Sequence, residues 1–240
     1  MSVLIVTGGS QGIGAAIARM AAARGWAVCL SSSRAGGPAD DVAAGIRAQG
    51  GQALAAQADA ADEAATARLF EAAATLGPVT GLVINAGITG PTSTIAALEA
   101  AALDEVLAIN VRGAFLTLRE GARRMTAGGI VLVSSRAAGL GGPGEWVHYA
   151  ASKGAVDSMT IGAAKELAPR GIRVNAVQPG LIDTPIHAKA GLPDRAERLG
   201  PSVPLGRPGT ADEVARVVLW LLSDDAAYVT GAIVPVSGGR

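Results

Sequence analysis

The sequence is poor in the residues on which several classes of protein depend. It contains one cysteine, Cys29, and two histidines, His148 and His187, among 240 residues. A single thiol excludes an internal disulfide, and the histidines and cysteine form no metal-ligand pattern. Because Cys29 lies inside an apolar run, we interpret it as a buried packing residue, in a protein suited to the reducing cytoplasm.

Net charge and long apolar runs are also lacking. Lys+Arg and Asp+Glu number 20 each, and no basic stretch predicts binding to nucleic acid. No apolar run reaches the roughly 18 residues that span a membrane. The start, MSVLIVTGG, has no positively charged segment and reaches glycine after seven residues, which predicts a strand and not a signal peptide. We expect a soluble intracellular protein that engages neither nucleic acid nor membranes.

Short apolar runs alternate with alanine-rich helical stretches, a pattern that predicts one doubly wound α/β domain over residues 1–240. Its parallel sheet has strands predicted at Val3–Thr7, Ala27–Ser31, Ala53–Ala58, Gly81–Asn85, Gly129–Ser134, Arg173–Gln178 and Ile233–Val236. Helices are predicted at Gly12–Arg24, Ala39–Gln49, Ala61–Leu76, Glu99–Ile109, Val111–Thr126, Glu145–Ala168 and Thr210–Ser223, the last with a capping box of Thr210 and Glu213. The Pro- and Gly-containing segment Leu181–Pro208 is expected to be mobile.

A glycine turn, TGGSQGIG, joins the first strand to the first helix. Glycines allow a tight turn and let the backbone approach a pyrophosphate, while the helix N-terminus beyond supplies free N–H groups and a positive dipole end. The spacing of Gly8, Gly12 and Gly14 differs from the GxGxxG form of many dehydrogenases. The turn predicts a dinucleotide site at this end of the sheet.

A second pattern carries chemistry. Tyr149 and Lys153 lie four residues apart on a predicted helix and therefore share one face, and Ser135 precedes the tyrosine by fourteen residues. A lysine ammonium beside the phenol is expected to lower the tyrosine pKa towards neutral pH. Such a phenol can exchange a proton with an alcohol or carbonyl oxygen, which a serine hydroxyl can hold.

Taken together, these features resemble the short-chain dehydrogenase/reductase family over essentially the whole chain. The matching residues are Thr7–Gly14, Asn85-Ala86-Gly87, Asn110 in NVRG, Ser135, Tyr149 with Lys153, and Pro179-Gly180. The resemblance implies a Rossmann-type sheet of seven parallel strands in the order 3-2-1-4-5-6-7, with helices on both faces. Within the family, the sequence resembles bacterial reductases related to sugar dehydrogenases and 3-oxoacyl carrier-protein reductases.

The resemblance implies hydride transfer between NAD(P) and a carbon that bears an oxygen. Tyr149 would be the general acid or base, and Ser135, or alternatively Ser134, would orient the substrate oxygen. Lys153 would lower the Tyr149 pKa and bind the nicotinamide ribose, and Asn110 would hold a water of a proton relay. The implied coenzyme-binding residues are Gly8, Ser10, Gln11, Gly12, Ile13, Gly14, Asp59, Asn85, Ala86, Gly87, Tyr149, Lys153, Pro179, Gly180, Ile182 and Thr184. Asp59 could alternatively be a plain N-cap, and Thr184 a turn residue.

The end of the second strand favours NADP over NAD. An NAD enzyme usually places an acid there, but this strand runs into Ser31, Ser32, Ser33 and Arg34. Hydroxyls and a guanidinium suit a 2′-phosphate. Gln11 weakens the case, because similar NADP-dependent sequences often have Arg or Lys at that position.

Three functions remain to be compared. The first is an NADP-dependent oxidoreductase acting on a small alcohol or carbonyl compound, with an NAD-dependent alcohol or sugar dehydrogenase as its variant. The second is a non-catalytic NADP-binding or sensing protein, which would usually lack the tyrosine or lysine. The third, a sugar-nucleotide epimerase, would need a larger C-terminal region. We also expect residues 181–208 to form the substrate lid, and the family resemblance implies a homotetramer or homodimer.

Overall fold

A seven-stranded parallel sheet forms the centre of the computed structural model, which describes residues 2–240; residue 1 of the predicted domain lies outside the described residues. The strands are β1 (Val3–Val6), β2 (Ala27–Ser32), β3 (Ala53–Gln57), β4 (Val79–Ile84), β5 (Gly128–Val133), β6 (Ile172–Pro179) and β9 (Ile233–Val236). Their order is β3-β2-β1-β4-β5-β6-β9, which confirms the predicted order with β9 as the seventh strand.

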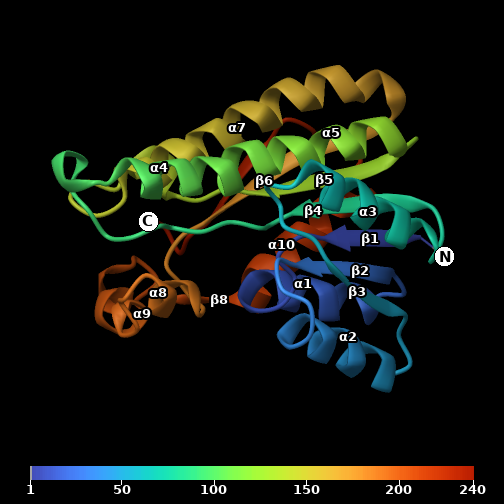
Figure 1. Ribbon diagram of the computed structural model, residues 1–240, viewed down its shortest axis with the longest axis horizontal. Helices are drawn as coiled ribbons and strands as arrows, with labels where there is room; N and C mark the ends of the chain where they lie inside the picture. The colour runs from blue at the N-terminus through green and yellow to red at the C-terminus, as the bar shows by residue number, and fades with distance from the viewer. Residues whose placement is uncertain (1) are drawn as a thin grey trace.

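Helices cover both faces of this sheet, as Figure 1 shows. The main helices are α1 (Gly12–Ala22), α2 (Pro38–Ala48), α3 (Glu63–Ala74), α4 (Ala100–Leu107), α5 (Ala114–Arg124), α7 (Val147–Leu167) and α10 (Ala211–Leu222). Strand β1 shows why two layers are needed: Leu4 and Val6 pack with α1, α2 and α10, whereas Val3 and Ile5 pack with α3, α5 and α7. Since alternate residues of a strand point to opposite faces, an apolar strand buried on both sides requires two helical layers.

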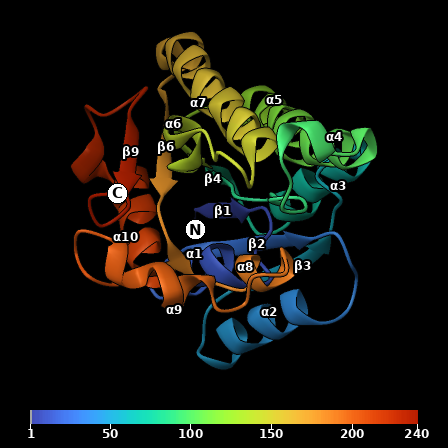
Figure 2. The ribbon, with the colours of Figure 1, turned by 90° about the vertical axis from the view of Figure 1, so that its left-hand side faces the viewer.

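The segment between β6 and α10 is folded rather than irregular. It contains α8 (Ile186–Lys189), α9 (Arg195–Leu199) and a single turn at Gly200–Ser202, and a pair of two-residue strands, β7 (Ile182–Asp183) and β8 (Gly209–Thr210), ties its two ends together. We call Ile186–Leu199 the lid. Figure 2, which views the molecule from the end where α8 and α9 lie, places the lid across that end of the sheet.

Two further departures from the sequence prediction concern helices. The two helices predicted around Asn110 form one rod, in which a π-helical turn, Ala108–Gly113, joins α4 to α5. A short helix, α6 (Ala137–Leu140), follows β5 and was not predicted. Single 3₁₀ turns at Ile95–Ala97, Ala168–Arg170 and Asp224–Ala226 complete the fold.

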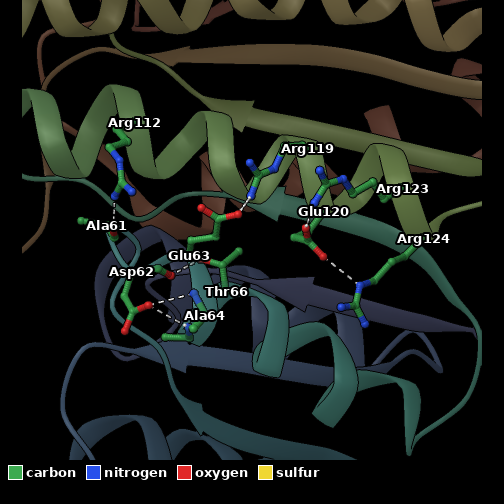
Figure 3. Close-up of polar contacts among 11 residues, drawn as sticks. Ala61, Asp62, Glu63, Ala64, Thr66, Arg112, Arg119, Glu120, Arg123 and Arg124 are labelled. Carbon is green, nitrogen blue, oxygen red and sulfur yellow. Dashed lines mark hydrogen bonds and ion pairs between the residues drawn. The ribbon is translucent and has the colours of Figure 1, made fainter.

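The start of α3 is held by polar contacts to α5, drawn in Figure 3. Asp62 is the N-cap, since its carboxylate accepts hydrogen bonds from the Ala64 and Ala65 amides at 2.8 and 3.1 Å. Arg119 forms an ion pair with Glu63 at 2.5 Å, and Arg112 donates to the Ala61 carbonyl. The cap of this helix is therefore Asp62 and not Asp59, whose alternative reading as the N-cap was wrong.

Membrane-spanning helices and clusters of metal ligands are both absent from residues 2–240. No helix in this range is both long and apolar enough to cross a membrane. Nor do three or more His, Cys, Asp or Glu side chains in this range come together as metal ligands.

Candidate active site

A cleft of about 1080 Å³ opens at the carboxyl ends of the strands and runs beneath the lid. In open α/β sheets this edge is where ligands bind. Most of the predicted site residues line the cleft: Gly8, Ser10, Gln11, Gly12, Ile13, Ser32, Asp59, Asn85, Ala86, Gly87, Ser134, Ser135, Tyr149, Lys153, Pro179, Gly180, Ile182 and Thr184. Gly14, Ser31, Arg34 and Asn110 were predicted for the site but do not line the cleft.

The glycine turn is locked against β4 by close packing. Gly8 has a φ of 63°, and a methyl group there would lie 2.9 Å from the Ala86 Cα. At Gly14 a methyl group would lie only 2.3 Å from the Gly8 carbonyl oxygen, so this glycine serves the packing of helix on turn. The Asn85 amide donates to the carbonyls of Thr7 and Gly8 at 3.0 and 2.9 Å. These contacts hold the backbone of the turn in one shape.

The cleft is narrow where the chain crosses from β6 to the lid. Thr184 lies opposite Gly12 of the glycine turn, because a methyl group on that glycine would lie 3.4 Å from the threonine Cγ2. Gly180 packs against Ser237, where an added methyl group would lie 2.7 Å from the Cα atom. Residues 179–184 therefore form the wall that faces the glycine turn.

The three polar side chains of the second pattern meet in this cleft. Tyr149 and Lys153 share one face of α7, with the Lys153 Nζ 5.8 Å from the centre of the Tyr149 ring. The Ser135 hydroxyl lies beside the phenol and accepts a hydrogen bond from the Ala137 amide at 3.1 Å. Ser134 instead donates to the Lys153 carbonyl at 3.1 Å and is 2% exposed. Of the two serines, only Ser135 has its hydroxyl beside the phenol.

The sequence predicted a lowered pKa for Tyr149, and this prediction was wrong in direction. Burial raises the pKa of the phenol above its ordinary value, and the contact with Ser135 opposes this only in part. The Lys153 Nζ donates to the Val133 carbonyl at 2.8 Å and lies 5.8 Å from the centre of the phenol ring. Burial also lowers the pKa of Lys153 to about 8, although the charge of Asp157 works against that change. Desolvation is therefore the largest cause of both pKa shifts.

Asn110 lies in the π-helical turn and is 1% exposed. Its Oδ1 accepts from the Ile88 amide at 2.8 Å, and its Nδ2 donates to the Ile88 carbonyl and to Ser152 Oγ at 2.7 and 3.0 Å. A methyl group at Gly87 would lie 3.1 Å from Asn110 Oδ1 and 3.3 Å from Lys153 Nζ. The two polar atoms thus face one small space beside Gly87.

The end of β2 is less enclosed than the glycine turn. Ser31 is 3% exposed, and its carbonyl accepts from the Gly9 amide at 2.9 Å, so it supports the turn from behind. Ser32 and Ser33 line the cleft, whereas Arg34 is exposed outside it. The Ser32 hydroxyl donates to the Arg34 carbonyl at 2.5 Å and shapes this loop.

The other half of the cleft lies between α7 and the lid. Arg195 makes two hydrogen bonds to the Glu145 carboxylate, at 2.8 and 2.6 Å, and its guanidinium lies 4.5 Å from the centre of the Trp146 ring. Trp146 lines the cleft. His187 also lines it, with Nε2 3.1 Å from the Ile182 carbonyl, and burial lowers the pKa of its imidazole.

Sequence reasoning missed several residues around this half. His148, next to Tyr149, is buried, with its Nε2 3.0 Å from the Thr89 carbonyl. Arg136 lines the cleft and donates to Gln178, which donates to Asp157 at 2.8 Å. One available signal was the charge of Arg136 directly after Ser135, and another was the i+4 spacing from Lys153 to Asp157.

The chain is similar to known proteins in both sequence and fold. A family model described as enoyl-(acyl carrier protein) reductase matches residues 8–240. The chain is 42% identical to cis-4-hydroxycyclohexanecarboxylate dehydrogenase of Sinomonas cyclohexanicum, over 99% of this chain and 95% of that protein. It is 41% identical to L-rhamnose 1-dehydrogenase (NAD(P)(+)) of Azotobacter vinelandii, over 98% of this chain and 95% of that protein.

Among solved structures, a dehydrogenase/reductase from Sinorhizobium meliloti 1021 superposes with a TM-score of 0.93 at 36% identity, over 99% of this chain and 94% of that one. The chain belongs to the short-chain dehydrogenase/reductase family. It is an NAD(P)-dependent oxidoreductase that acts on CH–OH or C=O groups of a small molecule.

Proposed function

We propose that this oxidoreductase uses NADP(H) and that Tyr149 exchanges the proton with a small alcohol or carbonyl substrate. The observation that carries the proposal is the meeting of Tyr149, Lys153 and Ser135 at the cleft, with Lys153 Nζ 5.8 Å from the phenol ring. The nicotinamide coenzyme, when bound, supplies or accepts the hydride. The rest of the chemistry is proton transfer and positioning, which fall to the side chains of this chain.

The proton passes between Tyr149 and the substrate oxygen. In carbonyl reduction the phenol donates its proton, and in alcohol oxidation the phenolate accepts one. A raised Tyr149 pKa favours the protonated phenol and hence the acid role of reduction. Ser135, beside the phenol, holds the same oxygen and fixes its distance from Tyr149.

Lys153 and Asn110 serve the proton supply. Asn110 Oδ1 and Lys153 Nζ both lie beside Gly87, and a water molecule bonded to both atoms would link them. Such a water would extend the route from Lys153 towards solvent. Lys153 would also bind the ribose of the coenzyme, since its ammonium has three donors and the Val133 carbonyl accepts one of them.

The glycine turn fits the pyrophosphate of the coenzyme, because Gly8 and Gly14 admit no side chain and α1 presents its N-terminus. Asp59 lines the cleft, where its carboxylate accepts from the Ala61 amide at 2.9 Å and can also accept from an adenine amino group. Pro179, Gly180, Ile182 and Thr184 would face the nicotinamide from the wall opposite the turn.

The NADP preference is supported by the residues after β2. Ser32 and Ser33 line the cleft, and the exposed Arg34 guanidinium is free to fold over a 2′-phosphate. The first carboxylates beyond them, Asp40 and Asp41, belong to the first turn of α2. The strand end therefore offers hydroxyls and a cation where an NAD enzyme offers an acid.

A fluorescence titration with NADPH and NADH, side by side, tests this proposal. We expect NADPH to bind at least tenfold more tightly, since charge-assisted bonds to a phosphate contribute roughly 1.5–3 kcal/mol. Tighter binding of NADH would replace the proposal with an NAD-dependent alcohol or sugar dehydrogenase. Coenzyme binding without turnover of any alcohol or carbonyl compound in a broad panel would favour the sensing role.

We also propose that the chain acts in the cytoplasm as a homotetramer or homodimer. The support is an apolar surface on the helices that the family commonly pairs: Leu107 of α4, Phe115 of α5 and Ile161 of α7 are 38%, 54% and 42% exposed. Light scattering coupled to size-exclusion chromatography tests the assembly. A mass of one chain, 23.7 kDa, at micromolar concentration would contradict it.

A further inference from the structure

We call the part of the cleft between α7 and the lid the substrate half. Glu145 lies where three of its walls meet. Its backbone carbonyl accepts a hydrogen bond from the Ser93 amide, in the loop after β4, at 2.8 Å. Its carboxylate accepts two hydrogen bonds from Arg195 of the lid, at 2.8 and 2.6 Å. Helix α7, which carries Tyr149, begins only two residues later. Glu145 therefore contacts both the loop and the lid, and it lies just before the helix that carries Tyr149.

Arg195, the partner of Glu145, is held both by hydrogen bonds and by an aromatic ring. Arg195 is 7% exposed, and its guanidinium stacks on Trp146 with 4.5 Å to the ring centre. A planar guanidinium can make a bidentate bond to a carboxylate and lie on an aromatic face at the same time. Hydrogen bonds from Arg195 lower the pKa of Glu145, so the pair stays charged at neutral pH.

We propose that the Glu145–Arg195 pair is a clamp that closes the lid over the substrate and fixes Tyr149 in place. The proposal rests on the function proposed above, in which Tyr149 transfers the proton. Glu145 and Arg195 are positioning residues in this account: they act on the lid and on the start of α7. The two residues are 50 positions apart, so the clamp joins segments that the chain itself leaves independent.

The need for a clamp follows from how the lid is attached. Its ends are tied by the short pairing of β7 with β8, in which Ile182 pairs with Gly209 and Asp183 with Thr210. Segments anchored through few contacts open at little free-energy cost. The pair is half-buried, with the Arg195 side chain 9% and the Glu145 side chain 39% exposed. Opening the lid would break its two charge-assisted hydrogen bonds and remove the Arg195 guanidinium from the Trp146 ring, so these contacts favour the closed state.

Hydrogen exchange measured by mass spectrometry tests the clamp without any substrate. In the full-length protein, Arg195→Met and Glu145→Gln should each speed exchange of the lid amides, residues 186–199, about tenfold. The double variant Glu145→Gln/Arg195→Met should exchange no faster than the faster single variant, because both changes remove one interaction. Wild-type exchange rates in the single variants, or multiplied effects in the double variant, would overturn the clamp.

Arg207 and Glu213 provide a matched control. They form a second bidentate pair, at 2.9 and 2.6 Å, but on the surface at the start of α10, and Arg207 lies outside the cleft lining. Arg207→Met should alter exchange only near that helix start. A lid that opens equally in Arg207→Met would show that loss of any arginine pair loosens the segment, and would overturn the assignment to Glu145 and Arg195.

Kinetics separate positioning from direct substrate binding. Two test alcohols suffice, neutral L-rhamnose and anionic cis-4-hydroxycyclohexanecarboxylate. The clamp predicts that both single variants lower kcat about tenfold with either alcohol, while the NADPH dissociation constant stays unchanged. A loss confined to Arg195→Met and to the anionic alcohol would make Arg195 a substrate contact and overturn the clamp.

The same data distinguish the two proposals. If Tyr149→Phe keeps wild-type turnover, the proposed function fails whatever the lid does. If Tyr149→Phe is inactive but the clamp variants match the wild type in lid exchange and kcat, the proposed function stands and the clamp fails.

Discussion

The two halves of the cleft are built in different ways. The coenzyme half consists largely of backbone at the carboxyl ends of β1 and β4, where the glycine turn is locked by Asn85 and by contacts too close for any side chain. The substrate half is closed by side chains of distant segments, chiefly Glu145, Trp146 and Arg195. The first half has its shape from the sheet, and the second from contacts between the lid and the start of α7.

This difference has a physical origin. A sheet with a large buried core keeps its strand ends in place, and the loops there inherit that rigidity. The lid has a smaller share of the core and depends on individual polar contacts. Variants in the coenzyme half should therefore change binding of one ligand, and variants near the lid should change turnover.

The largest effect is expected at Tyr149, which belongs to the substrate half. Tyr149→Phe should lower kcat about 1000-fold, within the range for loss of a general acid or base. NADPH affinity should change little. Steady-state kinetics and coenzyme titration measure the two quantities. The exposed Tyr228 is the matched control, and Tyr228→Phe should leave both unchanged. Full turnover in Tyr149→Phe would refute its role.

Lys153 touches both halves, so a change there should affect both quantities. Lys153→Met should lower kcat about 100-fold, because it removes the group that supplies protons to Tyr149, and should weaken coenzyme binding as well. The same kinetic and titration measurements report on it. Lys165→Met, on the exposed side of α7, serves as the control. Loss of rate with intact coenzyme affinity would restrict Lys153 to the substrate half.

The same variant should alter the pH dependence of stability. Burial lowers the pKa of Lys153 to about 8 from 10.5, so between these pH values the unfolded chain binds the proton that the folded chain has released. This group therefore adds stability as pH rises from 8 to 10.5. At pH 7 the charged lysine costs up to about 3 kcal/mol, which Lys153→Met would regain, less the loss of the bond to Val133. Urea unfolding at pH 7 and 10 should show this advantage shrinking, and a constant difference would contradict it.

A smaller effect confined to the coenzyme half is expected at Arg34. Arg34→Ala should weaken NADPH binding about tenfold and leave NADH binding unchanged, because only NADPH carries the 2′-phosphate. Arg24→Ala, exposed just after α1, controls for the loss of a surface charge. Equal losses for the two coenzymes would mean that Arg34 does not read the phosphate.

The smallest effect lies outside both halves. Asp62 caps α3 on the contact region with α5 (Figure 3), and Asp62→Ala should lower the free energy of unfolding by about 1 kcal/mol. Thermal melting measures this change. Turnover should be retained, and the exposed Asp41→Ala in α2 should have the smaller effect. A loss of coenzyme binding in Asp62→Ala would link this cap to the neighbouring Asp59.

Much of the fold followed from the sequence because its signals are local. Apolar runs located all seven strands, and the Thr210–Glu213 capping box located the start of α10, which both side chains confirm. Helix ends were off by one to three residues, and the π-helical turn at Asn110 was missed, since that turn depends on its packing and not on a local pattern. Asp62 was overlooked as a cap because the helix was predicted to begin at Ala61, so that Asp59 and not Asp62 preceded its first residue.

The sequence by itself determined the parallel sheet, the glycine turn and the spacing that puts Tyr149 and Lys153 on one helix face. Each depends on residues within a few positions of one another, where steric and periodic rules suffice. Tertiary structure alone decided the raised pKa of Tyr149 and the pairing of Glu145 with Arg195. Burial and contacts between segments 50 residues apart arise only when the chain is packed, and they set the electrostatics of the cleft.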